Sequence, residues 1–490
     1  MLIRTMRNMI FNTMRCCILL LAVSVVAISS TASAQQQYIL KTLVSFAGSN
    51  GDKPQTDLFM DASGNLFGTT VYGGAHDYGT VFEVTNHTLT TLVSFNGSNG
   101  QSPAAGLSAD SSGNLYGTTM FGGAHNDGTV FEVANNSNHT LTTLVSFGGT
   151  NGSQPETILT ADSSGNLYGA TEGGGTNGNG TVFKMSNNIN HTLTTLVNFN
   201  IRSTGQGSAG LLADAGGNLY GPTWWGTSAY GAVFKVANDA NHTFSTLATF
   251  NGTNGYKPTS NLVADAYGNL YGTTAFGGAN NDGTVFEVAN DTNHTLTNLV
   301  SFNGTNGQTS EGHLIADAAG NLYGTTGYGG ANGNGTVFEI ANNANHSLYT
   351  LFSFANSNGT NPAGVIMDAS GNLFGTTIYG GANNEGTVFE LSPILLGDFN
   401  FDGHVDAADI AAMEQTLANL PSYQSANGLS NSQLLAIGDI NGDGVFNNAD
   451  LQAFLDYLQS GGGSTNPVPE PSTFVLAVLA FGLFVVRRFE

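Results

Sequence analysis

The middle of the chain consists of short apolar segments separated by turn-forming residues. Within residues 101–150, the segments 106–110, 114–119, 129–133 and 140–147 are bounded by Ser-Ser-Gly, Gly-Gly and Asn-rich stretches. Short segments rich in Val, Thr, Phe, Tyr and Leu between such turns are typical of strands. The last segment alternates apolar and polar residues only in part, as expected for a less buried strand. This stretch therefore predicts four consecutive strands.

The same pattern fills seven successive blocks. Consecutive copies of its marker, Gly-Asn-Leu-(Tyr/Phe)-Gly, lie 49 to 52 residues apart. That period is too long for one hairpin and suits one four-stranded blade. The asparagines of the marker are Asn65, Asn114, Asn166, Asn218, Asn269, Asn321 and Asn372. The sequence therefore predicts an all-β fold, a seven-bladed β-propeller of four-stranded blades over residues 35–395.

The two ends of the repeat region are complementary. Block seven ends near Ser392 without a fourth strand, whereas residues 38–46 resemble a fourth strand with no block before them. We expect residues 40–46 to pair with residues 387–391 as the outer strand of the last blade. That pairing would close the ring and leave no blade incomplete.

An aspartate recurs before a turn in every block. Seven carboxylates in a ring would suggest a metal-lined channel, but a glycine follows each aspartate shortly afterwards, which favours a hairpin cap that accepts backbone N–H groups. The Gly-Gly doublets, such as Gly73-Gly74 and Gly380-Gly381, predict turns with positive φ, not phosphate loops, because no basic residue accompanies them. The aspartates are Asp61, Asp110, Asp162, Asp214, Asp265, Asp317 and Asp368.

A tripeptide Asn-His-(Thr/Ser) recurs in six predicted hairpins. It matches an N-glycosylation acceptor, and Asn is also a common turn former. The six histidines fall one to a blade, so they are not expected to form one metal site. The asparagines are Asn86, Asn138, Asn190, Asn241, Asn293 and Asn345.

Two motifs of the block, Asp-x-x-Gly-Asn-Leu-Tyr-Gly-Thr-Thr and Gly-Thr-Val-Phe-Glu, resemble the Gloeo/Verruco family of extracellular bacterial propeller repeats over about residues 38–392. The resemblance supplies no catalytic residues. Kelch repeats have a similar period, but the kelch tryptophan is missing here. Block four departs most from the pattern, with Trp224-Trp225 and with Ala232 in place of the usual threonine. The tryptophan pair could stack on a sugar ring or pack against a neighbouring blade.

Charge narrows the range of partners. Only 9% of residues are charged, and the net charge is −23. A nucleic-acid partner would need a basic surface, so none is expected. The acidity suits a secreted surface protein that takes up divalent cations.

After the propeller, two twelve-residue segments carry oxygen-bearing side chains at positions 1, 3, 5, 9 and 12 and glycine at position 6. Alternate residues of a tight loop can converge on one hard cation, and position 7 needs only its backbone carbonyl. We therefore predict two calcium ions. The predicted sites are Asp398, Asn400, Asp402, His404, Asp406 and Asp409 in the first loop, and Asp439, Asn441, Asp443, Val445, Asn447 and Asp450 in the second.

A helix is predicted after each loop, with one apolar face formed by Ile410, Met413 and Leu417 in the first, and by Leu451, Phe454, Leu455 and Leu458 in the second. We expect the two helices to pack together. Paired loops that end in Asp resemble a type I dockerin over residues 396–460. The resemblance implies calcium binding and a cohesin-like partner, although the partner-reading positions here are Ala407-Ala408 and Asn448-Ala449.

The N-terminus has the features of a secretory signal peptide. Three arginines precede an apolar run over residues 16–28, and Ala32-Ser33-Ala34 provides the small residues of a cleavage site. We expect residues 1–34 to be removed; the alternative is an uncleaved membrane anchor. Both cysteines lie in this segment, so the mature chain has no disulfide.

At the C-terminus, a Gly/Ser-type linker is followed by Pro469-Glu470-Pro471, an apolar stretch over residues 474–486, and Arg487-Arg488. This order of elements resembles a PEP-CTERM sorting signal. The resemblance implies an exosortase-type processing enzyme in a Gram-negative bacterium that makes extracellular polysaccharide. The apolar stretch is short for a bilayer span, so residues 461–490 are expected to anchor the chain only transiently.

Together these features predict a secreted or cell-surface protein with a binding, display or matrix role and without catalytic residues. Enzymes need unique, converging acid and base groups, whereas nearly every carboxylate here recurs in each block. Two alternatives remain: a polysaccharide-active lyase or glycosidase, and a dockerin-mediated subunit of an extracellular complex.

Overall fold

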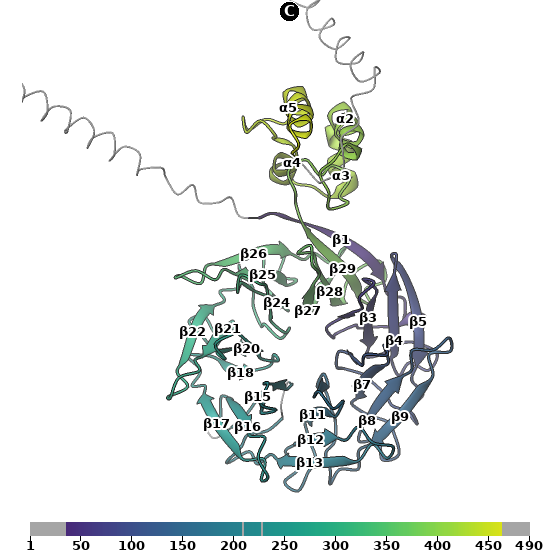
Figure 1. Ribbon diagram of the computed structural model, residues 1–490, viewed down its shortest axis with the longest axis vertical. Coiled ribbons are helices and arrows are strands. Elements are labelled where there is room, and N and C mark those ends of the chain that lie inside the picture. The colour runs from purple at the N-terminus through teal and green to yellow at the C-terminus, as the bar shows by residue number, and fades with distance from the viewer. Residues whose placement is uncertain (1–35, 208–209, 227–228, 463–490) are drawn as a thin grey trace, which may run out of the picture. The chain divides into compact units, whose positions relative to one another are not determined.

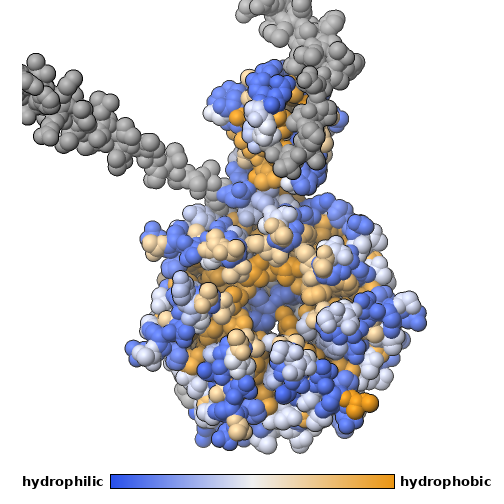
Figure 2. Space-filling model, in the orientation of Figure 1, coloured by the Kyte–Doolittle hydropathy of each residue, from blue (hydrophilic) through white to orange (hydrophobic). Residues whose placement is uncertain are grey.

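The computed structural model describes residues 36–207, 210–226 and 229–462. Seven antiparallel sheets are arranged in a ring around a common axis (Figure 1). Each sheet has four strands, and one gains a fifth short strand, β18 (Tyr256–Pro258). The predicted all-β, seven-bladed propeller of four-stranded blades is confirmed. In Figure 2, one face of the ring shows hydrophobic surface around hydrophilic residues at its centre.

Each blade runs from a short strand near the axis to a strand at the rim. The first strands are β2 (Phe59–Met60), β6 (Ser108–Ala109), β10 (Thr160–Ala161), β14 (Leu212–Ala213), β19 (Val263–Ala264), β23 (Ile315–Ala316) and the longer β27 (Thr360–Met367). The second strands are β3 (Leu66–Thr70), β7 (Leu115–Thr119), β11 (Leu167–Thr171), β15 (Leu219–Thr223), β20 (Leu270–Phe276), β24 (Leu322–Thr326) and β28 (Leu373–Tyr379).

The third strands are β4 (Thr80–Thr85), β8 (Thr129–Val133), β12 (Thr181–Met185), β16 (Ala232–Val236), β21 (Thr284–Val288), β25 (Thr336–Ile340) and β29 (Thr387–Pro393). The outer strands are β5 (Thr88–Ser94), β9 (Leu141–Ser146), β13 (Leu193–Asn198), β17 (Phe244–Thr249), β22 (Leu296–Ser301), β26 (Leu348–Ser353) and β1 (Tyr38–Ser45). A single 3-10 turn, η1 (Gly48–Asn50), follows β1. In the second block, all four strands lie within the predicted segments.

The core lies between blades and is organised by pairs of phenylalanines. At every interface, a phenylalanine that follows an outer strand meets edge-on a phenylalanine from the third strand of the next blade, with ring centroids 4.9 to 5.6 Å apart. All of these rings are fully buried. The pairs are Phe46–Phe82, Phe95–Phe131, Phe147–Phe183, Phe199–Phe234, Phe250–Phe286, Phe302–Phe338 and Phe354–Phe389.

These rings explain the glycine of the Asn-Leu-Tyr-Gly marker. Gly117 lies opposite Phe131 in the β7–β8 ladder. A Cβ atom on Gly117 would lie 2.6 Å from Phe131 Cζ, closer than packed atoms can approach. Gly68, Gly169, Gly272, Gly324 and Gly375 meet their phenylalanines in the same way. The marker is therefore a packing motif of the blade interface.

The ring is closed by the N-terminal strand, as predicted. Strand β1 pairs with β29 over a register that runs from Tyr38 opposite Pro393 to Ser45 opposite Thr387. A second link joins the first and last blades, because Thr376 Oγ1 donates to the carbonyl of Thr56 at 3.0 Å. Blade seven is thus assembled from both ends of the repeat region.

Threonine pairs tie the second and third strands of six blades together. Thr119 Oγ1 and Thr129 Oγ1, for example, lie 2.8 Å apart in the buried core. In blade four, Ala232 stands opposite Thr223, and Thr223 Oγ1 is buried without a hydrogen-bond partner among the described residues. The departure of block four therefore leaves a hydroxyl group unsatisfied.

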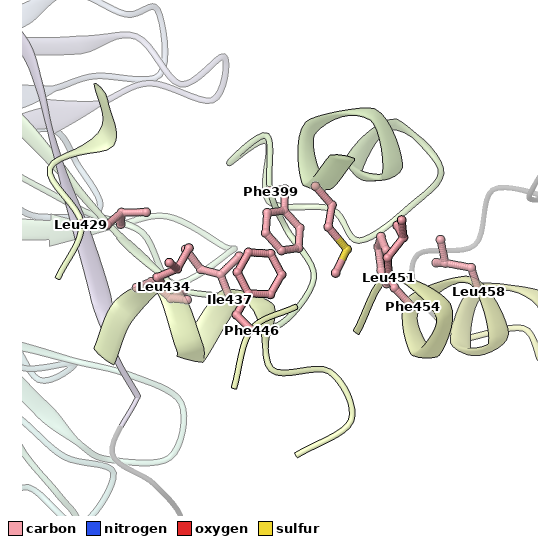
Figure 3. Packing of buried hydrophobic residues seen from close by; sticks show 10 residues of the cluster. Phe399, Leu429, Leu434, Ile437, Phe446, Leu451, Phe454 and Leu458 are labelled. Atoms are coloured by element: carbon pink, nitrogen blue, oxygen red, sulfur yellow. The ribbon is translucent and has the colours of Figure 1, made fainter. Parts of the chain in front are cut away.

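Among the described residues, four helices follow the propeller: α2 (Ala408–Ala418), α3 (Leu420–Asn427), α4 (Asn431–Gly438) and α5 (Asn448–Gln459). The expected packing of the helices after each loop is observed, because Met413 of α2 shares one buried cluster with Leu451, Phe454 and Leu458 of α5 (Figure 3). Helices α3 and α4 lie in the spacer between the loops and were not predicted. Ile394 also belongs to this cluster, which therefore extends to the end of β29.

The predicted signal peptide (residues 1–34) and the sorting segment with its Pro-Glu-Pro motif lie outside the described residues. Among the residues that are described, no helix has the length and hydrophobicity needed to cross a membrane.

A pair of matched substitutions tests ring closure. Phe46 follows the closing strand, and Phe302 occupies the equivalent place at an interior interface. We expect Phe46→Ala and Phe302→Ala to destabilise the propeller by a similar amount, about 3–5 kcal/mol each, measured by denaturant unfolding. A much smaller loss for Phe46→Ala would show that β1 is not an integral part of the ring.

A second substitution tests the unsatisfied hydroxyl of blade four. Ala232→Thr restores the threonine pair with Thr223, so we expect a gain of about 1 kcal/mol in unfolding free energy. Ala232→Val is the matched control, since it adds the same volume without a hydroxyl group. An equal gain in both variants would attribute the effect to packing alone.

Candidate functional site in the axial pocket and the C-terminal loops

The recurring aspartates are hairpin caps, as predicted. Asp110 Oδ1 accepts N–H groups from Ser112 at 2.8 Å and Asn114 at 3.0 Å, and its Oδ2 accepts from the Asn114 amide and the Tyr116 hydroxyl. Burial alone would raise the pKa of Asp110, but the hydrogen bonds, that of the Asn114 side chain foremost, outweigh it and lower the pKa. The other six aspartates accept from the N–H groups two and four residues later in the same way.

In the first predicted calcium loop, two buried carboxylates hold the loop ends. Asp409 is fully buried and accepts N–H groups from Phe399, Asn400 and Asp406 at 2.8 to 3.0 Å. Asp398 is also buried. Burial, with the nearby charges of Asp409 and Asp402 as smaller causes, raises the pKa of Asp398 to about 6. The structure thus buries negative charge here without a basic side chain within ion-pair distance in the described chain.

The remaining side chains of this loop organise its turn. Asn400 Oδ1 accepts from the Asp402 N–H, and Asp402 Oδ1 accepts from the His404 N–H, both at 2.9 Å. Gly403, at position 6, has φ of +79°, the left-handed geometry that the spacing requires. Asp406 Oδ1 accepts from the N–H of Ala408 at the start of α2.

The second loop repeats this arrangement with one difference. Asp450 is fully buried and accepts from the N–H groups of Asn441 and Asn447, and Asp439 Oδ2 accepts from Gly444 at 2.8 Å. Asp439 Oδ1, however, is buried without a hydrogen-bond partner in the described chain.

The rest of the second loop also forms a turn. Asn441 Oδ1 accepts from the Asp443 N–H, Asp443 Oδ1 accepts from the Val445 N–H, and Asn447 caps α5. The stacked rings of Phe399 and Phe446, with centroids 5.4 Å apart, join the two loops.

The donor set of both loops fits calcium. Every side-chain candidate except His404 and Val445 offers carboxylate or amide oxygen, and these two occupy the position that needs only a backbone carbonyl. The orphaned Asp439 Oδ1 is an acceptor that lacks a partner in the described structure. Within the described residues, no three His, Cys, Asp or Glu side chains converge closely enough to hold a metal. Calcium binding would therefore require these side chains to turn inward.

A second candidate site lies on the propeller axis. In each blade one residue precedes a buried leucine or valine of the innermost segment, and we call these seven residues the axial positions. They are Asp57, Gly106, Ile158, Gly210, Asn261, His313 and Gly364. The repeat is broken at these positions, because polar side chains occur in blades one, five and six only. Glycine provides space beside two of them, since a Cβ on Gly210 or Gly364 would overlap Asn261 or Asp57.

The three polar axial residues come together. His313 Nδ1 contacts Asp57 Oδ2 as an ion pair or hydrogen bond, and Asn261 Nδ2 lies 3.4 Å from the same nitrogen. These side chains come from blades one, six and five. Only the ring closure brings Asp57 next to His313, which lies far from it in sequence.

Asp57 and His313 line a cavity with a volume of about 150 Å³, and two further unrepeated carboxylates line it as well. Its walls include Asp57, Glu156, Trp224, Glu311 and His313. Neither Glu156 nor Glu311 has a hydrogen bond or ion pair among the described residues.

The surroundings of these carboxylates disfavour their charged form. Burial, reinforced by Glu172 and opposed by Lys257, raises the pKa of Glu156 to about 7. Burial also raises the pKa of Glu311, and Lys257 again opposes it. We call this cavity the axial pocket.

One residue that lines the axial pocket has an unsatisfied polar atom. Trp224 Nε1, a donor, is buried and has no hydrogen-bond partner in the described part of the chain. Lys257 Nζ lies 5.2 Å from the centre of the Trp224 ring. A hydroxyl group of a bound molecule would satisfy this atom, because a hydroxyl oxygen can accept a hydrogen bond.

This site was not predicted from the sequence, because its carboxylates do not recur from blade to blade. The available signal was departure from the repeat: the three residues before the buried leucine read Gln-Thr-Asp, Glu-Thr-Ile, Thr-Ser-Asn and Glu-Gly-His in blades one, three, five and six. Trp224 lines the pocket, whereas Trp225 is 37% exposed and packs edge-on against Tyr256 of the next blade.

Comparison with known proteins supports the architecture. The family profile of the Gloeobacter/Verrucomicrobia repeat matches residues 26–228 and 209–432. No curated protein matches the sequence.

Among solved structures, the extracellular domain of BT4673 from B. thetaiotaomicron superposes with a TM-score of 0.50 at 11% identity, covering 72% of this chain and 39% of that one. This chain thus spans about two fifths of the length of that domain. PorZ, a surface component of the type-IX secretion system of Porphyromonas gingivalis, gives 0.45 at 12% identity, covering 71% of this chain and 47% of PorZ. The gluconolactonase XC5397 of Xanthomonas campestris gives 0.40 at 12% identity, covering 74% and 93%. At 11% identity, the likeness to the BT4673 domain shows a similar fold alone.

The raised pKa of Glu156 predicts a pH-dependent effect on stability. The group titrates near 4.5 when unfolded and near 7 when folded. Its contribution to stability is therefore fully present below about pH 4.5 and is lost as the pH rises through about 7. We expect Glu156→Gln to match the wild type at pH 4 and to exceed its unfolding free energy by about 2 kcal/mol at pH 8.

Urea unfolding at both pH values measures this difference. Glu414→Gln, in α2, removes the same charge outside the pocket and should show no such gain. A Glu156→Gln variant no more stable than the wild type at pH 8 would mean that solvent fully hydrates this carboxylate.

Proposed function

The chain belongs to the Gloeobacter/Verrucomicrobia repeat family, and we propose that it is a secreted, surface-sorted propeller that binds a ligand without converting it. The signal peptide and the sorting-type C-terminus support the location at the cell surface. An exosortase-type enzyme would process the C-terminal segment, which alone would contact the membrane. The closed ring supports a display or binding role, because it holds the axial pocket in a fixed geometry.

The C-terminal helices and loops form, in this proposal, a dockerin-like module that binds two calcium ions. The observation that carries it is Asp439 Oδ1, a buried carboxylate oxygen without a partner in the described residues. The two fully buried aspartates at position 12, Asp409 and Asp450, also favour a cation, because buried carboxylates are costly without one. Calcium would supply the missing positive charge, and the loops would hold it through oxygen atoms.

A cohesin-like domain remains a candidate partner of this module. The face that such a domain would read carries Ala407-Ala408 and Asn448-Ala449. These small side chains suit a close protein contact, although they give little charge or hydrogen bonding for specificity.

A polysaccharide-active enzyme is the second candidate function. The unrepeated groups of the axial pocket favour it: Asp57 next to His313, and Glu156 and Glu311 with raised pKa values. A binding protein leaves oligosaccharides intact, whereas an enzyme releases shorter or unsaturated products. Incubation with neutral, basic and acidic polysaccharides followed by mass spectrometry separates the two, and we expect no product.

Calcium titration of the mature chain tests the module. We expect two sites by calorimetry, and Asp439→Ala should remove one of them, since it deletes position 1 of the second loop. Asp402→Ala should remove the other. The helix signal in circular dichroism should fall when calcium is chelated.

Asp456→Ala is the matched control, because Asp456 lies outside both loops and its carboxylate accepts a hydrogen bond from the Gln452 side chain on the same helix. It should retain both sites. An unchanged stoichiometry in Asp439→Ala, or no calcium-dependent change in helix content, would rule the module out as a calcium site.

A further inference from the structure

A set of aromatic residues occupies equivalent positions in six blades. Each lies at the end of the second strand or just after it and immediately precedes a glycine, and each pairs with a residue of the segment that enters the same blade. We call this set the aromatic collar: Tyr72, Phe121, Trp225, Phe276, Tyr328 and Tyr379. Only blade three lacks an aromatic residue here, with Gly173 in its place.

The collar is solvent-accessible, although large aromatic side chains are usually buried. Tyr72, Trp225, Tyr328 and Tyr379 are 37% to 50% exposed. Aromatic faces left open at equivalent places around a ring are not needed for the core, which the phenylalanine pairs already fill.

Two pairs of collar residues are bridged across blade boundaries by other side chains. Lys53 Nζ lies 4.7 Å from the ring centre of Tyr72 and 5.5 Å from that of Tyr379, which links blades one and seven. Tyr256 bridges Trp225 and Phe276, with ring centroids 5.7 and 5.9 Å away. At these two boundaries the collar residues therefore belong to larger groups of neighbouring side chains.

The collar and the axial pocket are parts of one surface. A groove of about 610 Å³ is lined by Phe276, Tyr328 and Glu311, and Glu311 also lines the axial pocket. Trp224, which lines the pocket, is the immediate neighbour of Trp225 in the collar. A chain-like ligand could therefore lie across the aromatic rings and place its end in the pocket.

We propose that the aromatic collar and the axial pocket bind the end of a polysaccharide built from amino sugars with free, protonated amines. The proposal rests on the binding function above and names the ligand class of that site. The aromatic faces stack on sugar rings, whose C–H groups are weakly apolar. A sugar hydroxyl would accept a hydrogen bond from Trp224 Nε1, which otherwise lacks a partner among the described residues.

Charge selects the amino sugar over the alternatives. Glu156 and Glu311 face the pocket without a hydrogen bond or ion pair within the described chain, and Asp57 adds a third carboxylate, already paired with His313. The positive charge of Lys257 is close enough to both glutamates to lower their pKa values in part. An ammonium group would gain charge-assisted hydrogen bonds here, whereas a uronic acid or sulfated sugar would be repelled.

Two matched oligosaccharides test the proposal on the mature full chain. A glucosamine tetramer and its N-acetylated counterpart share one backbone and differ only in amine charge. Titration calorimetry near pH 7, where a fraction of the amines is protonated and the Glu156 carboxyl, with a pKa of about 7, is partly ionised, should show tighter binding of the glucosamine tetramer. An oligogalacturonate of the same length should not bind.

Variants separate the contributions of charge and stacking. Glu156→Gln and Glu311→Gln keep the side-chain shape, and each should weaken glucosamine-tetramer binding by about tenfold while leaving the N-acetylated tetramer unaffected. Trp225→Ala and Tyr328→Ala should weaken both ligands by about tenfold. The controls are Glu414→Gln and Tyr267→Ala; Tyr267 is 82% exposed and lies outside the collar.

The outcomes distinguish this inference from the proposed function. If neither tetramer binds, if the acetylated or acidic ligand binds more tightly, or if the glutamate variants bind like the wild type, the ligand assignment is wrong. If the glucosamine tetramer binds selectively and is cleaved, the ligand class stands and the non-catalytic function is wrong. Calcium binding is tested separately with the loop variants. Its outcome does not change how the sugar-binding results are interpreted.

Discussion

The edge-to-face contact between two phenylalanines at each blade interface is the interaction on which the ring depends. Each contact joins the outer part of one blade to the third strand of the next, with centroids about 5 Å apart throughout. Gly117 and its equivalents are required because the phenylalanine ring occupies the place of their side chain. The seventh contact exists only because β1 brings Phe46 beside Phe82, so closure and core packing are one requirement.

Because these contacts hold the ring together, the residues at its axis can vary from blade to blade. Each innermost segment contributes one buried leucine or valine to the core, whereas the axial position before it varies, with Asp57, Asn261 and His313 in three blades and glycine in three others. Closure then brings residues from the first and sixth blades into contact. The collar residues, unlike the axial residues, are repeated, and they place an aromatic side chain at the equivalent position of six blades. A repeated aromatic surface around an unrepeated polar pocket suits a ligand that is itself a chain with a distinct end.

Most of the fold was predictable because the same sequence pattern occurs in seven blades, so each copy supports the strands and turns predicted from the others. The period, the turn residues and the unmatched strands at the two ends predicted the blades and the closing strand. The aspartate caps followed from their position before a turn.

The axial pocket was not predicted, because its residues converge through the curvature of the whole ring and no local spacing encodes that. Helices α3 and α4 were missed for a different reason. Their sequences, such as Leu420–Asn427 with a proline at its second residue, show no clear apolar face, and packing against Phe399 and Phe446 supports them instead. The predicted calcium loops lie between these cases, since their spacing predicted the glycine turn at position 6, whereas calcium binding stays a prediction.

The most direct test of this account is a crystal structure of the mature chain soaked with the glucosamine tetramer. We expect electron density for a sugar chain lying over Phe276 and Tyr328, with its terminal ring in the axial pocket and its amine between Glu156 and Glu311. Density for the tetramer elsewhere on the molecule, with the axial pocket filled only by water, would contradict the assignment of function to the unrepeated residues of the axis.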